Sequence, residues 1–327
     1  MFRAIFGFGQ SIILVITMFT TAGLFVPREL GCYLRRLDRM GIYDNRTRDS
    51  VPQTEFFDLI IDHFAQARDD DRTPKAIMIV YDGARADALV NTRGSDESAI
   101  FLLQREGGRI YHMHTGGPLR NRQGTDTAQG FATILTGRWA DGAGGHGVFT
   151  NGHTKSVNPP LVFQPLLEQG YVDSAAFVVS WNGHFTRANA DGVGTANYSN
   201  DVALFDELGL NMNWSMNSND AASVATAIDM LEDPDGPGFL VISLEYTDSA
   251  GHRSTFGNHN PEYVQAFHNA ERAGLEMIEA IRARPTYAQE DWLIMVTSDH
   301  GGYSIYHGRQ FQVARQVFLA VNRDLGW

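Results

Sequence analysis

We expect an α/β fold from this sequence: a mostly parallel central sheet with helices on both faces and room for a small cap. Three observations support this expectation. Short apolar segments alternate along the chain with longer segments in which apolar residues recur at helical spacing. The apolar segments are almost unbroken, as in strands that helices bury on both faces. The 327 residues, 43% of them hydrophobic, are enough for one large domain with a filled interior.

The expected elements follow one another in the strand–helix alternation of crossover connections. A helix over 56–66 has apolar residues on one face, and 76–81 is a buried strand that ends at Asp82 and Gly83. Further expected strands are 109–114, 174–180, 238–245, 292–297 and 317–321, and further expected helices are 99–105, 128–135, 162–169, 221–231 and 261–284. Residues 140–160 and 182–220 are rich in Gly, Asn and His without clear periodicity, so we expect active-site loops or the small cap there.

The N-terminal segment differs in composition from the rest. Residues 4–26 contain no charged side chain, Arg3 precedes them, and 20–22 offer small residues for cleavage. The run also reaches the roughly 20 residues needed to cross a bilayer. We therefore expect a signal peptide or membrane anchor over 1–26, a connector over 27–54 and the α/β domain over 55–327, with a buried helix as the alternative for the first segment.

Both a signal peptide and a membrane anchor over residues 1–26 lead us to expect an extracytoplasmic protein, either secreted or held at the membrane by this segment. Four arginines follow the run within 28–39, and in a retained anchor they would favour the cytoplasmic side for the C-terminal part. This preference conflicts with an extracytoplasmic location, and cleavage of the segment resolves the conflict only in part.

Charge and cysteine content exclude several classes of protein. The formal net charge of −12 argues against a nucleic-acid-binding surface, which is usually basic. The excess acid is either an ordinary solvated surface or, in part, aspartates that bind metal. The single cysteine, Cys32, excludes an intramolecular disulfide and a Cys-rich zinc site.

Acids and histidines follow three of the expected strands directly. In an open α/β sheet the carboxyl ends of the strands share one edge, where binding sites form. The side chains expected at that edge are Asp82, Asp248, His252, Asp299, His300 and His307. Each one alone could belong to a turn or a surface loop, but together they predict a metal site. Carboxylates mixed with imidazoles suit zinc or manganese.

Thr127 is the candidate nucleophile because it lies at the start of the helix expected over 128–135. A helix N-terminus presents free backbone N–H groups to an oxyanion or a phosphate. A threonine hydroxyl is a weak nucleophile by itself, and a nearby metal ion would lower its pKa. The alternative is that Thr127 only caps the helix, a role that catalysis would not exclude.

These residues lie in segments that resemble one enzyme family. Residues 80–88 (VYDGARADA) resemble the first metal-binding strand of type I phosphodiesterases and nucleotide pyrophosphatases, which belong to the alkaline phosphatase superfamily. Residues 127–137 (TAQGFATILTG) are similar to the family's nucleophile helix. The segments 248–252 (DSAGH) and 298–301 (SDHG) match its Asp-x-x-Gly-His and Ser-Asp-His-Gly motifs, and His307 resembles its closing histidine.

The resemblance implies a role for each residue. One divalent ion would lie among Asp82, Thr127, Asp299 and His300, and a second among Asp248, His252 and His307. Zinc is favoured, with manganese as the alternative. The reaction would pass through a phospho-threonine at Thr127.

The chain departs from related patterns at two points. Sulfatases of the superfamily have a modified cysteine followed by Pro and Arg at the nucleophile position, so Thr127 argues against sulfatase activity. Nucleotide pyrophosphatases have an asparagine three residues after the nucleophile, where this chain has Gly130. Another group would then contact the phosphoryl oxygen, and Asn182 and His184 are the candidates, with a polar loop near the site as the alternative.

We therefore expect a metal-dependent phosphoester hydrolase that acts on a small-molecule or lipid substrate, with a phosphodiesterase or nucleotide pyrophosphatase favoured. A phosphomonoesterase or an envelope phosphotransferase is the alternative among enzymes. A non-catalytic, metal-stabilised binding protein is the alternative from another class. All seven positions expected for metal ligands and nucleophile carry a suitable residue, which argues against a non-catalytic binding protein.

Overall fold

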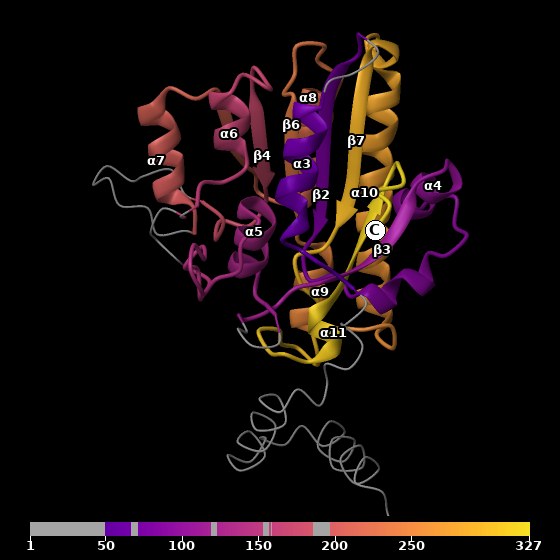
Figure 1. Cartoon of the computed structure of the whole chain (residues 1–327). Helices are drawn as coiled ribbons and strands as arrows, with labels where there is room; N and C mark the ends of the chain where they lie inside the picture. Colours follow the sequence, from indigo (N-terminus) through magenta and orange to yellow (C-terminus); the bar gives the residue numbers. More distant parts are fainter. Residues whose placement is uncertain (1–49, 67–70, 119–122, 153–156, 158, 186–196) are drawn as a thin grey trace, which may run out of the picture. The chain divides into compact units, whose positions relative to one another are not determined.

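A single eight-stranded sheet forms the centre of the fold (Figure 1). The computed structural model describes residues 50–66, 71–118, 123–152, 157, 159–185 and 197–327. The strands are β1 (Val51–Pro52), β2 (Thr73–Tyr81), β3 (Arg109–His114), β4 (Ala175–Val179), β5 (Met212–Met216), β6 (Phe239–Leu244), β7 (Glu290–Thr297) and β8 (Gln316–Val321). Their order across the sheet is β1-β3-β8-β7-β2-β6-β4-β5. All pairs are parallel except those of β8, which is antiparallel to both β3 and β7.

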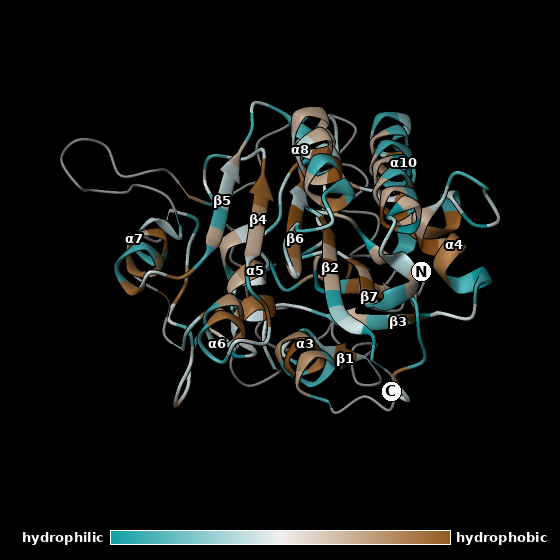
Figure 2. Ribbon diagram, turned by 90° about the horizontal axis from the view of Figure 1, so that it is seen from above, coloured by the Kyte–Doolittle hydropathy of each residue, from teal (hydrophilic) through white to brown (hydrophobic). Residues whose placement is uncertain are grey.

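Helices cover both faces of this sheet (Figure 2). One face packs against α3 (Glu55–Ala65), α5 (Thr127–Thr136), α6 (Phe163–Glu168) and α7 (Ser199–Leu208). The other face packs against α4 (Ala99–Arg105), α8 (Asp220–Glu232), α9 (Tyr246–Arg253) and α10 (Pro261–Ala283). Short helical turns η1 (Ala86–Asn91), η2 (Tyr287–Gln289) and α11 (Gln312–Arg315) complete the described part.

The central strand β2 explains why both faces need helices. Its alternate side chains point to opposite sides, so that Ala76, Met78 and Val80 enter one core and Ile77 and Ile79 enter the other. All five are fully buried. An apolar run of this kind is stable only when both faces are covered, which is the reason it predicts a parallel α/β sheet.

Helix ends follow from local chemistry. Asn219 caps α8 by accepting a hydrogen bond from the Ala222 N–H, and Asn260 caps α10 with Pro261 in the first helical position. α5 ends at Gly137, whose φ of 64° is the left-handed conformation that glycine adopts without strain.

The expected fold class is confirmed, and every strand and helix expected by range is present within a few residues. Two elements lie where only loops or a cap were expected: α7 packs on the sheet, and β5 extends the sheet at its edge beside β4. These two elements lack clear periodicity in the sequence because α7 has a weak apolar stripe and β5 is a half-exposed edge strand, and residues 186–196 of the same region lie outside the described residues. α9, which follows β6 directly, was also not expected from the sequence.

The sheet begins at β1, inside the segment expected as the end of the connector. The rest of that connector and the proposed signal or anchor over 1–26 lie outside the described residues. In the part of the chain that is described, no helix combines the length and the apolarity needed to span a membrane.

Candidate active site

The predicted site residues follow three strands that are neighbours in the sheet. β2 lies between β6 and β7, and all three strands run in the same direction (Figure 1). Asp82 directly follows β2, Asp299 and His300 follow β7, and Asp248 lies in the first turn of α9 after β6. The order of the strands therefore brings the three aspartates to one edge.

Gly83 lets two of these segments approach each other closely. Its φ is +67°, and a Cβ added there would lie 2.8 Å from Asp248 Oδ1 and 2.9 Å from Asp248 Cα. Gly130 likewise allows α5 to lie close to the segment after β7, because a Cβ added at Gly130 would lie 2.7 Å from the Asp299 carbonyl oxygen. The missing side chain at Gly130 is thus explained by packing.

One cluster surrounds the Thr127 hydroxyl. Oγ1 lies 3.2 Å from His300 Nε2 and 3.5 Å from Asp82 Oδ1. His300 Nε2 also lies 3.4 Å from Asp82 Oδ1 and 3.5 Å from Asp299 Oδ2. All four side chains are buried. Thr127 is the first residue of α5, so its hydroxyl stands at the positive end of that helix.

A second cluster adjoins the first and is closer to solvent. His252 Nε2 lies 3.2 Å from Asp248 Oδ2 and 3.0 Å from His307 Nε2, and His307 Nε2 lies 3.8 Å from Asp248 Oδ1. Ligand atoms of Asp82, Asp248 and His300 all lie within 4.8 Å of one another, which joins the two clusters. The structure therefore brings together all seven residues expected as metal ligands or nucleophile.

Each of the three histidines has one ring nitrogen fixed by an acceptor. Nδ1 of His300 lies 2.9 Å from the Gly301 carbonyl, and Nδ1 of His252 lies 2.9 Å from the Ile305 carbonyl. Nδ1 of His307 lies 2.9 Å from Asp126 Oδ1. Since an oxygen acceptor requires Nδ1 to carry the proton, the neutral ring presents the Nε2 lone pair to the cluster.

This arrangement fits a bound cation. The Nε2 lone pairs of His252 and His307 face each other at 3.0 Å, which is unfavourable unless a proton or a metal ion lies between the rings and Asp248. Asp82 Oδ2, Asp248 Oδ1 and Asp299 Oδ2 are buried and have no hydrogen-bond partner among the described residues. Buried carboxylate oxygens without partners are strongly disfavoured, and coordination to a metal would satisfy them.

The electrostatics of the clusters lead to the same conclusion. Burial, together with the charge of Asp299 and other carboxylates, raises the pKa of Asp82 well above its usual range, and burial does the same for Asp299. Burial and the neighbouring His307 lower the pKa of His300 to about 4, so the ring is neutral at pH 7. Burial alone would raise the pKa of Asp248, but a protonated His252 ring beside it brings that pKa below the ordinary value. Several carboxylates thus lie close together here, and a bound cation would supply the opposite charge.

Two residues that contact the site, Asp126 and Asn151, were not predicted from the sequence. Asp126 orients His307, and its position directly before Thr127 was the available signal. Asn151 accepts a hydrogen bond from the Ala128 N–H at 2.9 Å, which places its side-chain amide beside the start of α5. It lies in the 140–160 region, where no periodicity distinguishes it from its neighbours.

The two residues expected to contact substrate are placed differently from each other. His184 is fully buried, its Nε2 lies 3.3 Å from Ser243 Oγ, and its ring lies against Phe131. Burial lowers its pKa to about 3, so it is neutral. Asn182 is exposed. The hydrogen bonds of Thr127 among the described residues go to Asp82 and His300, so a substrate role for Asn182 and His184 stays a prediction.

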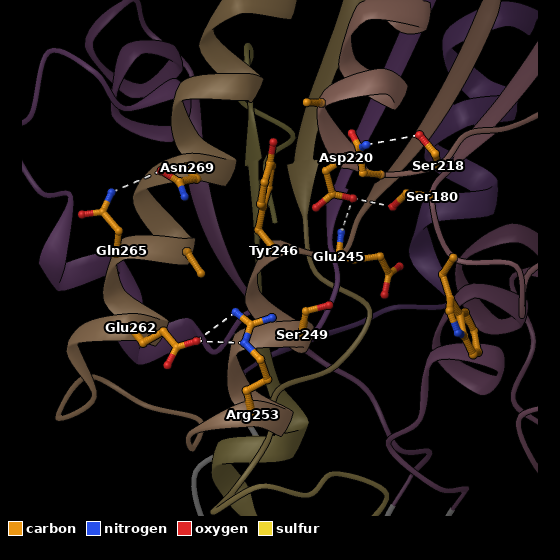
Figure 3. Close-up of a pocket in the computed structure, with 14 residues that line it drawn as sticks. Ser180, Ser218, Asp220, Glu245, Tyr246, Ser249, Arg253, Glu262, Gln265 and Asn269 are labelled. Atoms are coloured by element: carbon orange, nitrogen blue, oxygen red, sulfur yellow. Dashed lines mark hydrogen bonds and ion pairs between the residues drawn. The ribbon is translucent and has the colours of Figure 1, made fainter.

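A cavity of about 680 Å³ lies beside the clusters, on another face of α9 (Figure 3). Tyr246, Ser249 and Arg253 line it at helical spacing, whereas Asp248 and His252, four residues apart, face the clusters. Glu245 is common to both regions, because its carboxylate, Asp82 and His184 have ligand atoms within 4.8 Å of one another. The cavity is therefore a neighbour of the candidate site and does not contain it.

Comparison with known proteins gives one family match. A model of the family described as type I phosphodiesterase / nucleotide pyrophosphatase matches residues 76–316. A search of curated proteins finds no match. The matched range includes Asp82, Thr127, Asp248, Asp299 and the other residues of both clusters.

Several solved structures are similar at low sequence identity. Murine ectonucleotide pyrophosphatase / phosphodiesterase 5 is 17% identical with a TM-score of 0.46, over 69% of this chain and 57% of that chain. Phosphonoacetate hydrolase from Sinorhizobium meliloti 1021, in complex with phosphonoformate, is 17% identical with a TM-score of 0.44, over 70% and 57%. The C-terminal periplasmic domain of EcEptC from Escherichia coli, in complex with zinc, is 11% identical with a TM-score of 0.45, over 80% and 76%. The chain thus spans 57% of the length of the first two.

Proposed function

Because the chain belongs to the type I phosphodiesterase / nucleotide pyrophosphatase family, we propose that it hydrolyses a phosphodiester with Thr127 as the nucleophile. Membership assigns the chain to phosphoester-hydrolysing enzymes, and the nucleophile and the substrate class are our own proposals. The observation that carries them is the position of Thr127 Oγ1, at the N-terminus of α5 and 3.2 Å from His300 Nε2.

We propose two divalent cations, with zinc favoured over manganese, because the ligands are carboxylates and imidazoles. Asp82, Asp299, His300 and the Thr127 oxygen would hold one, and Asp248, His252 and His307 would hold the other. When bound, such ions lower the pKa of a coordinated hydroxyl or water and stabilise the charge that develops on a phosphoryl oxygen.

The chain's own residues would perform the remaining steps. Thr127 Oγ, after loss of its proton, forms a bond to phosphorus while the bond to the leaving-group oxygen breaks and takes the electron pair with it. Water then attacks the phospho-threonine, which returns the Thr127 hydroxyl and releases a phosphomonoester. The positive end of α5 favours the phosphoryl group in both steps.

Asn151 supports the same proposal as a group that binds the phosphoryl oxygen. Its Oδ1 accepts from the N–H of Ala128, the residue directly after the nucleophile, and its Nδ2 has no hydrogen-bond partner among the described residues and can donate to a substrate. A side-chain amide in this position can take over the contact that Gly130 cannot make. Hydrogen-bond donors directed at a developing negative charge each contribute about 10²–10³ in rate.

We also propose that residues 1–26 export the protein or anchor it at the membrane, and that the enzyme works outside the cytoplasm. The support is the uncharged run over 4–26, which is long enough for either role. The connector would then cover 27–54, and the catalytic domain 55–327. Expression of the full chain, followed by N-terminal sequencing of the exported protein, tests this proposal.

The test of the proposed reaction compares bis(p-nitrophenyl) phosphate with p-nitrophenyl phosphate as substrates of the zinc-loaded full chain. Thr127→Ala should abolish turnover. Thr136→Ala, on the same helix but directed to the Ala132 carbonyl, is the matched control and should retain it. Faster hydrolysis of the monoester would overturn the diester assignment. Equal activity in the Thr127 variant would overturn the nucleophile.

A further inference from the structure

The start of α9 depends on a carboxylate that belongs to α8. Asp220 is the first residue of α8 and is 7% exposed. Its Oδ1 accepts a hydrogen bond from the Glu245 N–H at 3.0 Å and one from the Ser180 hydroxyl (Figure 3). One buried side chain thus connects the end of β4, the start of α8 and the start of α9.

This contact caps α9 from outside the helix. The first N–H groups of a helix have no partner within it and need an acceptor. Glu245, in the N-cap position of α9, makes no capping bond with its own side chain. Asp220 accepts the N–H of Glu245, the first of the free N–H groups at this end, and its negative charge suits the positive end of the helix. Without Asp220, the Glu245 N–H at the start of α9 would lose this partner.

α9 is short and carries two residues of the second cluster. It spans eight residues, with Asp248 in its first turn and His252 in its last. A second tether, from the Thr247 hydroxyl to the Asp82 carbonyl, holds the same turn against β2. Asp220 holds it against α8 and β4. A shift of the first turn would move the Asp248 carboxylate relative to Asp82 and His307.

We infer that Asp220 is a positioning residue for metal binding: it fixes α9 so that Asp248 and His252 present their ligand atoms to one cation. This inference rests on the proposed function for the identity of the ligands. Asp220 has no contact with Thr127 among the described residues, and it acts through the backbone of α9. Substitution of groups that orient metal ligands costs about 10–100-fold in metal affinity or activity.

The experiment measures zinc affinity of the full chain by competition with a chromophoric chelator, together with the free energy of unfolding. Glu271→Ala is the matched control for Asp220→Ala. Glu271 is also a buried carboxylate that caps another helix, accepting from the Ile100 N–H of α4 at 3.2 Å, and α4 carries no residue of either cluster. We expect Asp220→Ala to weaken binding of one zinc equivalent about 10–100-fold. Glu271→Ala should lose stability with unchanged zinc affinity.

Two milder variants keep the inference testable if Asp220→Ala does not fold. Asp220→Asn retains an oxygen acceptor and should restore most of the zinc affinity, and Ser180→Ala should weaken affinity less than Asp220→Ala. Unchanged zinc affinity in a folded Asp220→Ala protein, or an equal loss in Glu271→Ala, would overturn the inference. The readout is binding, so a wild-type protein that binds zinc but hydrolyses neither p-nitrophenyl ester would refute the proposed reaction alone.

Discussion

Gly83→Ala is the most demanding test of the site geometry. Gly83 follows Asp82 at the end of β2 and has a φ of +67°. Its Cα faces the first turn of α9, where an added methyl group would lie 2.8–2.9 Å from three atoms of Asp248. The substitution therefore changes the separation of two cluster residues without removing any ligand atom.

Two effects add in this variant. A left-handed conformation costs a residue with a Cβ about 1–2 kcal/mol relative to glycine. Forcing a methyl group into a filled space costs about 1–3 kcal/mol more. Gly94→Ala isolates the first effect, because Gly94 has a φ of +79° and nothing within 4 Å of an added Cβ. The difference between the two variants, about 1–3 kcal/mol, is then the result of crowding against Asp248.

The assay is urea denaturation of the zinc-loaded protein, with zinc affinity measured on the same samples. We expect Gly94→Ala to lose stability without losing zinc, and Gly83→Ala to lose more stability and to bind one zinc equivalent more weakly. If the two variants have the same stability and the same zinc affinity, the close approach of β2 to α9 does not determine the position of Asp248.

Further predictions concern the residues around the clusters. Asp126→Ala should weaken zinc binding about 10-fold by removing the acceptor that orients His307, as zinc titration would show, and an unchanged affinity would contradict the role of Asp126. Asn151→Ala should lower kcat against bis(p-nitrophenyl) phosphate about 100-fold while zinc affinity stays constant, and a change in KM alone would count against it. Burial raises the pKa of Glu271 from 4.5 to about 7, so its stabilising contribution is complete below pH 4.5 and is lost as pH rises through 7. Glu271→Gln should therefore flatten the pH dependence of the unfolding free energy by up to about 3 kcal/mol, and parallel curves would refute this. Chelation of the metal should lower Tm, because zinc at a hundred times its Kd stabilises the native state by about 2.7 kcal/mol, whereas an unchanged Tm would argue that the clusters bind no cation.

The fold was predictable because its signals are local. Continuous apolar runs such as 76–81 identify buried strands, and the long amphipathic segment over 261–284 identifies α10. The meeting of Asp82, Asp248 and Asp299 was predictable for a related reason: each follows a strand, and the carboxyl ends of parallel strands share one edge. The sequence does not state that β6, β2 and β7 are neighbours, and it is this adjacency in the sheet that brings the three aspartates close together.

Other features depend on contacts between distant segments. α9 was missed because its residues are polar and directly follow a strand. The role of Asp220 depends on its contact with Glu245, which lies 25 residues later in the chain. The contact of Asn151 with the Ala128 N–H joins a glycine-rich loop to α5, and no sequence period encodes it. Such features arise from tertiary contacts, which no local sequence pattern encodes.

The orientation of the histidines illustrates the same limit and has a practical consequence. Two of the three Nδ1 anchors are backbone carbonyls, from Gly301 and Ile305, and no side-chain substitution can delete a carbonyl. Asp126 is the only side chain among the described anchors. It also directly precedes Thr127, so the residue that orients a ligand of the second cluster lies next to the nucleophile in the first. A change at Asp126 should therefore affect both clusters, whereas a change at Asp220 should act on the second cluster through α9.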